Sequence, residues 1–357
     1  MKEQIRSAQI VLPCADFNRT LEFFTERLGF RVEMIFPADA PSTAVVSGYG
    51  TTLRLEESEE ILQSPPTLRL LCDFSSLPAE TPREILSPDG VRVLLTDAES
   101  PIEIPDGTQE FILTTLADEN SWSEGRAGMQ YRDLIPGRLG GRFVASHIRI
   151  PEGGEIPDYV HFHKVRFQMI YCIAGWAKLV YENQGEPFVM NAGDCVLQPP
   201  EIRHRVLESS QKFEVLEIGC PAIHETFADY QLSLPNETIA LEKIYGNQRF
   251  LHHVADKAVW NKSQFEAFES RDTGIAEATG GLADVRVLRA TVDSRFSVKH
   301  SGEFLFFFVL KGNLKLDGER TISLKEGDGF VLPNGAEYFI DAVRGLELLR
   351  VSLPADS

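Results

Sequence analysis

The C-terminal part of this sequence repeats one pattern twice, and this duplication restricts the folds open to the chain more than any other feature. Between residues 116 and 353, five short patterns recur in the same order: Ala117-Asp118 with Trp122 as Ala255-Asp256 with Trp260, Arg132-Asp133 as Arg271-Asp272, Gly140-Gly141 as Gly280-Gly281, Ala174-Gly175 as Lys311-Gly312, and Gly193-Asp194 as Gly327-Asp328. The offset stays between 134 and 140 residues. Five ordered matches are hard to obtain by chance, so we expect two copies of one structural unit.

Both copies are rich in short apolar runs that are separated by glycine, proline and asparagine. In the first copy these runs lie at residues 143–150, 169–173, 177–181, 195–198 and 213–218. Short strands without a long helical pattern indicate a β-sandwich or a β-barrel. The stretch from 234 to about 270 connects the copies and contains pieces with a helical pattern.

The first copy carries three histidines at spacings typical of a metal site. In His161-Phe162-His163 the two imidazoles stand at positions i and i+2, which leave the same face of a strand. Gln168 follows five residues after His163, and Gly193 leads through Pro199 and a proline-rich turn to His204. We therefore expect His161, His163 and His204 to bind one divalent metal ion.

This arrangement resembles the two sequence motifs of the cupin superfamily. The motif residues are, in chain order, Gly153-Gly154, His161, His163, Gly175, Gly193, Pro199 and His204. The resemblance implies a double-stranded β-helix, or jelly-roll, barrel with one metal. It also implies a non-haem metal, with Fe(II) as the first choice and Mn, Ni, Cu or Zn as alternatives.

Two residues depart from the cupin pattern. Glu201 stands where a turn glycine is usual, and Gln168 stands where the fourth ligand is usually glutamate. Gln168 offers a neutral amide oxygen, so it is either a weak ligand or a hydrogen-bond partner of bound water or substrate. Three neutral imidazoles leave the metal its full charge and open positions, which favours an anionic chelating substrate.

The second copy lacks most of these ligands. Alignment of the copies places Val298, His300, Leu305 and Tyr338 opposite His161, His163, Gln168 and His204. One histidine does not hold a metal against water. Phe304 and Phe306 to Phe308 are typical of a barrel filled by side chains, so we expect a second, structural barrel.

Other polar residues are weaker candidates. His147, Arg149 and Gln198 are candidates for a substrate pocket in the first barrel, although His147 and Arg149 can equally belong to a solvated outer face. For residues outside the motifs we expect structural roles. Tyr171 should point outward from the barrel, and Cys172 and Cys195 should fill it as small apolar side chains. His224, His252 and His253 should lie at the surface.

Residues 1–97 form a different pattern, a small α+β unit. We expect strands at 10–12, 44–46, 52–55, 67–72 and 91–95, and a helix at 18–28 that Asp16 caps and Gly29 ends. The runs at 12–17, 23–30 and 87–90 resemble the vicinal-oxygen-chelate, or glyoxalase-like, family. Metal-binding members carry a histidine and carboxylates where this chain has Gln9, Arg54 and Leu94. The resemblance therefore implies a unit without a metal, which is either a structural partner or binds a small organic molecule.

The predicted fold class is mainly β, with two cupin barrels preceded by a small α+β glyoxalase-like domain. The predicted boundaries are 1–97 for the glyoxalase-like domain, 98–115 for a linker, 116–233 for the metal-binding cupin, 234–253 for a second linker, and 254–357 for the degenerate cupin.

The composition of the chain restricts the classes of molecule that it can bind. A formal net charge of −18 disfavours nucleic acid and anionic membrane surfaces. No apolar run approaches the roughly 20 residues that span a bilayer, and the N-terminus does not resemble a signal peptide. The five cysteines are scattered without a CxxC pair, which is typical of a reducing cytoplasm. We expect a cytoplasmic homo-oligomer, with a dimer as the first choice, and a small-molecule substrate.

The functional prediction is a metal-dependent enzyme, with a non-haem dioxygenase as the first choice, whose substrate is a small chelating compound: a phenolic compound, a diketone, or a hydroxy or keto acid. A metal-dependent isomerase or lyase is an alternative, but it needs a general base that the sequence does not reveal. The other alternative is a non-catalytic metal-binding or small-molecule-binding protein.

Overall fold

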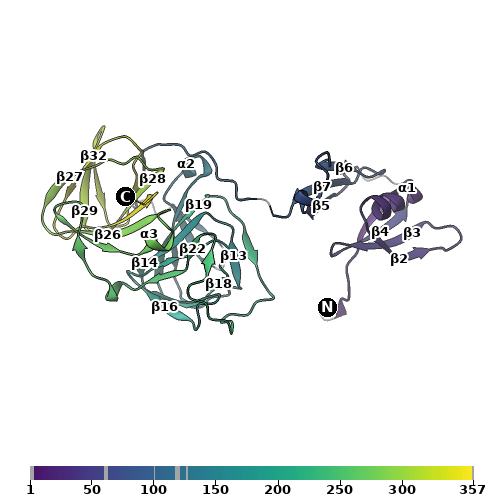
Figure 1. Ribbon diagram of the computed structural model, residues 1–357, viewed down its shortest axis with the longest axis horizontal. Coiled ribbons are helices and arrows are strands. Elements are labelled where there is room, and N and C mark those ends of the chain that lie inside the picture. Colours follow the sequence, from purple (N-terminus) through teal and green to yellow (C-terminus); the bar gives the residue numbers. More distant parts are fainter. Residues whose placement is uncertain (1–3, 60–62, 100, 117–120, 126–127, 356–357) are drawn as a thin grey trace. The chain divides into compact units, whose positions relative to one another are not determined.

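The computed structural model describes residues 4–59, 63–99, 101–116, 121–125 and 128–355, and it divides into two compact units, Met1–Pro101 and Ile102–Ser357 (Figure 1). Separate hydrophobic cores stabilise the two units. Ala117 and Asp118 of the repeated pattern lie outside the described residues. None of the helices in the described part of the chain is long and apolar enough to cross a membrane.

The N-terminal unit contains two small sheets and one helix. The first sheet has the order β1 (Ile10–Cys14), β4 (Thr51–Glu57), β3 (Thr43–Gly48) and β2 (Arg31–Phe36). The second has the order β5 (Thr67–Cys72), β7 (Arg92–Asp97) and β6 (Glu84–Leu86). Helix α1 (Phe17–Glu22) continues as the π-helical segment η2 (Phe23–Arg27), and a 3₁₀ turn, η3, spans Phe74–Ser76. The predicted strands and helix of this unit are thus confirmed, while its glyoxalase-like identity stays a prediction.

Two aspartates fix the start of α1. The Asp16 side chain accepts a hydrogen bond from the Arg19 amide at 3.1 Å, which caps the helix. Asp89, in the turn at 87–90, accepts a second bond from the Ala15 amide at 2.8 Å and a third from the Thr20 hydroxyl. The turn is therefore tied to the helix N-terminus, which explains why both patterns occur in one unit.

The C-terminal unit contains two barrels, each made of two facing sheets. In the first barrel one sheet has the order β23-β17-β14-β19-β11-β10-β9 and the other β16-β15-β18-β13-β20, with β12 paired to β18. Its strands are β9 (Trp122–Glu124), β10 (Gln130–Asp133), β11 (Val144–Ile150), β12 (Gly154–Glu155), β13 (His161–His163), β14 (Phe167–Ala174), β15 (Trp176–Tyr181), β16 (Phe188–Asn191), β17 (Cys195–Leu197), β18 (His204–Ser209), β19 (Phe213–Cys220), β20 (Thr226–Ala228) and β23 (Leu251–His253).

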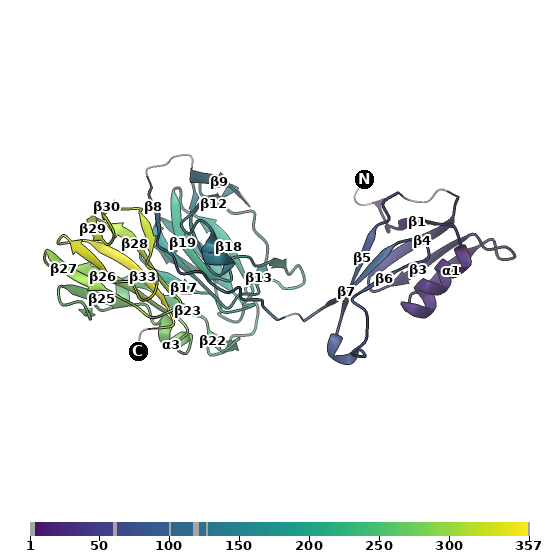
Figure 2. The same ribbon diagram turned by 90° about the horizontal axis from the view of Figure 1, so that it is seen from above.

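The second barrel repeats this plan with the sheet orders β24-β25-β26-β33-β28-β31-β8 and β27-β32-β29-β30. Its strands are β8 (Ile112–Thr114), β24 (Asn261–Lys262), β25 (Phe268–Asp272), β26 (Asp284–Ala290), β27 (Ser294–Val298), β28 (Phe304–Lys311), β29 (Asn313–Asp317), β30 (Thr321–Lys325), β31 (Gly329–Val331), β32 (Tyr338–Ala342) and β33 (Glu347–Leu353). The remaining elements of the unit are α2 (Arg138–Gly141), the hairpin of β21 (Ile244–Tyr245) and β22 (Gln248–Arg249), η6 (Ala255–Lys257) and α3 (Ile275–Ala278). Figure 2 shows the two groups of strands side by side, teal for the first barrel and green to yellow for the second.

The barrels exchange strands. β8 precedes the first barrel in sequence but pairs with β31 of the second, and β23 precedes the second barrel but pairs with β17 of the first. Both strands lie in segments predicted as linkers, 98–115 and 234–253, so these segments are parts of the sheets. Three-residue strands show no readable alternation of polar and apolar residues, which is why the sequence does not reveal them.

A shared hydrophobic core holds the two barrels together. Phe143 and Phe304, one from each barrel, stack with ring centroids 4.2 Å apart. Tyr171 and Cys195 are buried in this shared core, so Tyr171 points out of its own barrel but not into solvent. Cys172 packs inside the first barrel, as predicted.

Candidate metal centre

The three predicted histidines meet on the inner face of the first barrel. His161 on β13 and His204 on β18 are directly paired in register, and His163 leaves β13 on the same face. One ring nitrogen from each histidine lies within 4.8 Å of the other two. The ring centroids of His161 and His204 are 4.3 Å apart, and His163 lies 5.3 Å and 5.5 Å from them.

Hydrogen bonds orient the imidazoles. Nδ1 of His161 donates to the Tyr159 carbonyl at 2.8 Å, and Nδ1 of His204 donates to the Ile202 carbonyl at 3.0 Å. Nδ1 of His163 has longer contacts, 3.4 Å to the Glu225 carbonyl and 3.3 Å to the Thr226 hydroxyl. A proton on Nδ1 places the lone pair on Nε2, the arrangement that a metal-binding histidine needs.

Asp158 adds a buried carboxylate behind His161. Its Oδ1 lies 3.5 Å from Nδ1 of His161, and its Oδ2 accepts a hydrogen bond from the Val206 amide at 3.0 Å. A carboxylate behind a histidine raises the basicity of the ligand nitrogen. The donor set and its supporting contacts therefore fit a divalent metal ion.

Glu201 keeps the turn that leads to His204 despite the missing glycine. Its φ is +63°, the left-handed conformation that glycine adopts most easily. Its amide donates to the carbonyl of His163 at 2.9 Å, which joins the two histidine-bearing segments.

Gln168 lies beside the histidines, but its amide nitrogen has another partner. Nε2 of Gln168 donates to Oε1 of Glu217 at 2.8 Å, and both side chains line the same cavity. This bond turns the amide so that its Oε1 is the atom that can approach a metal. Glu217 is a functional candidate that the sequence reasoning missed. The sequence could have indicated it, because Glu217 continues the alternation of Phe213 and Val215 and so places an acid on the inward face of β19.

The cavity has a volume of about 330 Å³ and combines an apolar wall with a polar end. Its lining residues are Met129, Tyr131, Ile148, Ile150, His161, His163, Gln168, Ile170, Leu179, Tyr181, Met190, Gln198, His204, Val206, Phe213, Val215, Glu217, His224 and Thr226. Gln198, one of the predicted pocket residues, lines the cavity and is hydrogen-bonded to the Tyr181 hydroxyl. Burial raises the pKa of Tyr181, so its phenol stays protonated and neutral.

His147 and Arg149 do not line this cavity, which corrects the prediction that they belong to the substrate pocket. Ile148 and Ile150 of the same strand face the cavity, and alternate residues of a strand leave opposite faces. His147 instead accepts a hydrogen bond from Arg132 at 3.1 Å and donates one to Glu214 at 2.8 Å. Arg149 stacks on the Trp122 ring at 3.9 Å. Burial holds the pKa of His147 below its ordinary value.

His224 was expected at the surface, yet it lines the cavity. Its ring centroid lies 5.3 Å from that of His163, and its Nδ1 contacts the Pro221 carbonyl at 3.0 Å. His252 and His253 are also partly buried rather than exposed, because β23 pairs with the first barrel and His252 stacks on Phe188 at 4.2 Å. No local pattern surrounds these histidines, so only the tertiary fold locates them.

The second barrel has the predicted replacements in equivalent places. Val298 pairs with Tyr338 as His161 pairs with His204. Leu305 pairs with Ser352 as Gln168 pairs with Gly219. Val298, Leu305 and Phe307 belong to the core that fills this barrel. Among the described residues, His161, His163 and His204 are the one group found with metal-ligand geometry.

The comparisons with known proteins agree with this architecture. Residues 146–219 match the model of the cupin domain family. The matched segment contains both histidine-bearing strands and Gln168, so the match covers the whole candidate metal centre.

Solved structures with similar folds cover most of the chain at low sequence identity. An oxalate decarboxylase from Lactobacillus farciminis, in a formate complex, has 16% identity and a TM-score of 0.51 over 71% of this chain and 89% of its own. A salicylate 1,2-dioxygenase from Pseudaminobacter salicylatoxidans has 14% identity and a TM-score of 0.52 over 70% and 86%. An oxalate decarboxylase mutant from Bacillus subtilis has 13% identity and a TM-score of 0.51 over 72% and 80%. These likenesses support the mainly β, two-barrel fold. A comparison with curated protein sequences finds no match.

Proposed function

We propose that this chain is a metal-dependent enzyme that acts on a small chelating anion in the first barrel. The observation that carries the proposal is the convergence of His161, His163 and His204 on one side of an apolar cavity. Nδ1 of all three rings donates to a backbone carbonyl, which favours metal binding through Nε2. Fe(II) is the first choice of metal, and Mn, Ni, Cu or Zn suit the same donors.

When bound, a divalent metal supplies Lewis acidity toward a chelating anion, and a redox-active one such as Fe(II) also supplies electrons to dioxygen. The protein ligands are neutral, so an anionic substrate balances the charge of the site. The apolar wall, with Ile148, Ile170 and Val215, excludes water and selects a substrate with an apolar body. A volume of about 330 Å³ limits that substrate to a small molecule.

A dioxygenase reaction is the first candidate. The suitable substrates are phenolic acids, β-diketones and hydroxy or keto acids, since each offers two oxygens to one metal. The likeness in fold to a salicylate 1,2-dioxygenase supports this choice. Gln198 and the protonated Tyr181 phenol would help to hold a substrate oxygen, because both are polar groups on the cavity wall.

A lyase or isomerase reaction is the second candidate, and Glu217 favours it. Its carboxylate lines the cavity and is fixed by the bond from Gln168, so it can take or return a proton at a bound substrate. The sequence alone reveals no such group, which favours an oxygenase at that level. The likeness in fold to oxalate decarboxylases agrees with this second candidate.

Metal content tests the proposal first. Inductively coupled plasma mass spectrometry on untagged full-length protein is expected to give about one metal per chain. The double change His161→Ala and His163→Ala is expected to remove it, because one histidine does not retain a divalent ion. His300→Ala is the matched control, since His300 is the counterpart of His163 in the second barrel and belongs to no group with metal-ligand geometry among the described residues. No metal in wild type after loading with Fe(II), Mn(II) and Zn(II) would leave the non-catalytic binding role.

Turnover with and without oxygen separates the two reactions. Catechols, salicylates, β-diketones and hydroxy acids are incubated with the metal-loaded protein in air and under argon. A dioxygenase consumes dioxygen in step with substrate and stops under argon. A lyase or isomerase continues under argon and loses its activity in Glu217→Gln.

A further inference from the structure

The second barrel carries a buried arginine at the place where the first barrel has its acid. In the first barrel Glu217 pairs with Ile170 across β14 and β19. In the second barrel Arg350 pairs with Phe307 across the equivalent strands β28 and β33. The register gives Arg350 and Glu217 the same position, so the barrel without metal ligands has a cation where its copy has an anion.

Arg350 shares its buried carboxylate partner, Asp284, with a second arginine. Its side chain is only 4% exposed, and its Nη1 donates to Oδ2 of Asp284 at 3.2 Å. The same oxygen accepts a bond from Nε of Arg286 at 2.8 Å. Asp284 therefore faces two guanidinium groups. Arg286 also pairs with Asp272 at 3.0 Å, and since these side chains are 37% and 44% exposed, solvent screens this ion pair.

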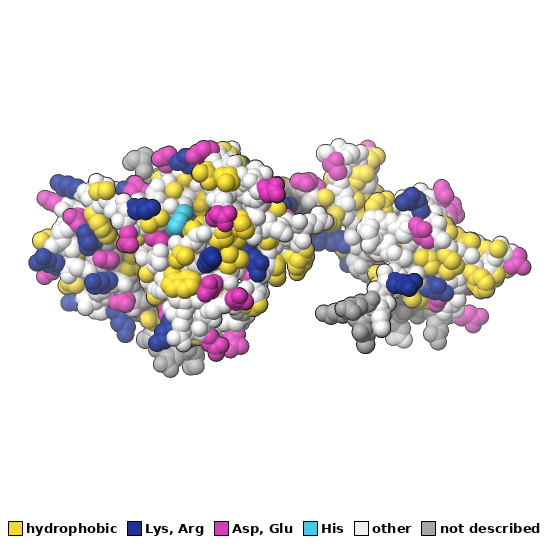
Figure 3. Space-filling model, turned by 90° about the horizontal axis from the view of Figure 1, so that it is seen from below, with side chains coloured by type: hydrophobic (Ala, Val, Ile, Leu, Met, Phe, Trp, Pro, Cys, Tyr) yellow, Lys and Arg dark blue, Asp and Glu magenta, His cyan; other side chains and the backbone are white. Residues whose placement is uncertain are grey.

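Two cavities meet at Arg350. The larger is an open cavity of about 770 Å³, where Arg350 lies with Lys299, Ser301 and the apolar side chains of Phe265 and Leu305. No carboxylate is among its described lining residues. This is notable in a chain with a net charge of −18. On the face of the C-terminal unit seen in Figure 3, acidic and basic side chains are intermixed instead.

The smaller cavity, of about 160 Å³, shares Gln264, Phe265 and Arg350 with the larger one, and the buried Asp284 also lines it. Ser270 lines it and is 4% exposed, and its Oγ has no hydrogen-bond partner among the described residues. A buried hydroxyl without a partner costs free energy unless a ligand or water satisfies it. The pair of cavities thus offers a buried guanidinium with its partner Asp284, a hydroxyl and an apolar wall.

We propose that the second barrel binds a small organic carboxylate, with Arg350 as its anchor. The planar guanidinium matches a carboxylate with two parallel hydrogen bonds, and Lys299 adds charge at the rim. Phe265 and Leu305 pack against the apolar body of the ligand, which inorganic phosphate lacks. No metal takes part, so the site is independent of the metal centre in the first barrel.

Isothermal titration calorimetry with benzoate tests the site on the full chain. The His161→Ala/His163→Ala background removes metal-dependent binding in the first barrel, so the result does not depend on the proposed function. Benzoate is expected to bind at one site per chain, and Arg350→Gln is expected to weaken it by about 10-fold or more. Benzamide, of the same shape without the charge, and inorganic phosphate are expected to bind at least about 10-fold more weakly than benzoate.

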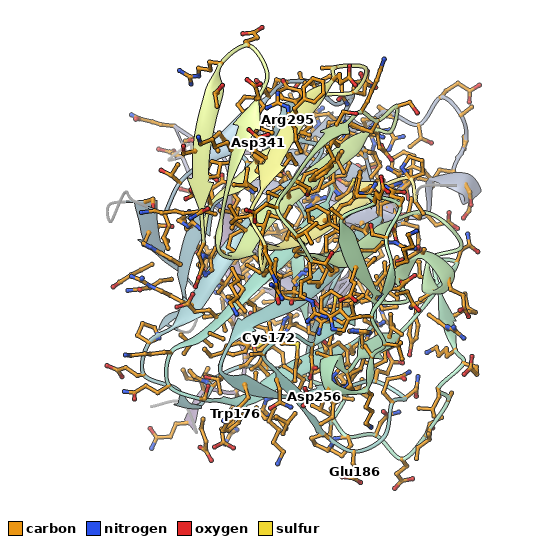
Figure 4. All side chains as sticks on the ribbon, turned by 90° about the vertical axis from the view of Figure 1, so that its left-hand side faces the viewer. Cys172, Trp176, Glu186, Asp256, Arg295 and Asp341 are labelled. Atoms are coloured by element: carbon orange, nitrogen blue, oxygen red, sulfur yellow. The ribbon has the colours of Figure 1, made fainter. Side chains whose placement is uncertain are left out.

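A matched arginine serves as control. Arg295 lies in the same barrel and pairs with Asp341 at 2.9 Å, and the two labelled side chains lie together in Figure 4. Arg295 is 49% exposed and does not line either cavity, so Arg295→Gln should leave benzoate binding unchanged. If Arg350→Gln does not fold, Arg350→Leu/Asp284→Asn removes both buried charges together and should show the same loss.

Three results would overturn the proposal. They are no benzoate binding in the background protein, equal binding in the folded Arg350 variant, and phosphate or benzamide binding as tightly as benzoate. The last of these would assign the cavities to inorganic anions or to neutral aromatic compounds instead.

Discussion

Arg132 of the first barrel donates a hydrogen bond of 2.6 Å from its Nη2 to the carbonyl oxygen of Gly327 in the second barrel. Its counterpart Arg271 reaches in the opposite direction, from Nη2 to the carbonyl oxygen of Gly193 at 3.2 Å. Reciprocal contacts of this kind arise when an approximate twofold axis relates two copies. The Arg-Asp and Gly-Asp patterns that recur in the sequence therefore belong to one interface between the barrels. Each barrel contributes one arginine and one glycine carbonyl to it.

The first prediction concerns Arg132, which is almost fully buried and also donates to Nδ1 of His147 at 3.1 Å. Arg132→Met should lower the stability of the C-terminal unit by about 2–4 kcal/mol, because two buried acceptors lose their donor. Urea unfolding followed by tryptophan fluorescence measures the change.

Arg271→Met provides the comparison. The bond of Arg271 to the Gly193 carbonyl, 3.2 Å, is longer than the 2.6 Å bond of Arg132 to Gly327, while its bond to the Tyr171 hydroxyl is 3.1 Å, so we expect a smaller loss. A loss from Arg271→Met that equals or exceeds that from Arg132→Met would contradict this interpretation of the interface.

The sequence predicts the parts of the structure that depend on local spacing. The i, i+2 spacing of His161 and His163 specifies a common face on any strand, and the alignment of the copies places Val298 and Tyr338 correctly. The glycine pairs also have a local cause. Gly140, near the end of α2, and Gly280, just after α3, have φ of +73° and +61°, which other residues adopt with strain.

The parts that depend on distant pairing could not be predicted in the same way. β8 and β23 are too short for an alternation pattern, and their partners lie far away in sequence. His224 reaches the cavity only because a loop returns to His163. The inward face of β11 could have been predicted, since an apolar barrel interior favours Ile148 and Ile150 over His147 and Arg149.

The second prediction concerns an added negative charge next to the metal centre. Gln168→Glu should lower the melting temperature of the metal-free protein, since it replaces the 2.8 Å hydrogen bond to Glu217 with two adjacent carboxylates. A bound divalent metal offsets this repulsion. The rise in melting temperature on adding Mn(II) or Zn(II) should therefore be larger than in wild type, and differential scanning fluorimetry measures both.

The double change Gln168→Glu/Glu217→Gln is the control, because it restores one amide and one carboxylate in exchanged places. It should recover most of the melting temperature of the metal-free protein. If Gln168→Glu alone is as stable as wild type without metal, the contact between Gln168 and Glu217 does not matter energetically.

The third prediction is a loss of stability in weak acid. The pKa of His147 is lowered by burial from an ordinary value of 6.5, so the unfolded chain binds a proton more readily than the folded one. The contribution of His147 is complete above about pH 6.5 and is lost as the pH falls through its lower pKa in the folded protein. Glu214 also contributes stability that is lost on acidification, but at lower pH, because the bond from His147 lowers the pKa of Glu214 below 4.5.

Melting temperatures of wild type and His147→Gln between about pH 7.5 and 5.5 test this linkage. The variant should be less stable at the upper pH and should lose less on acidification, so the two curves converge. Parallel curves would mean that His147 does not titrate differently in the folded and unfolded states. The metal-site histidines are present in both proteins and cancel in the comparison.

The fourth prediction uses the division of the chain at Pro101 and Ile102. A protein that begins at Ile102 should fold and should bind metal with the stoichiometry of the full chain, because the barrels have their own core and all of the proposed ligands. Metal analysis and the melting temperature are measured on both proteins. Failure of the shorter protein to fold would show that the N-terminal unit is needed for stability. Retained metal with lost turnover would instead give that unit a part in substrate binding, which separates the two roles that its sequence leaves open.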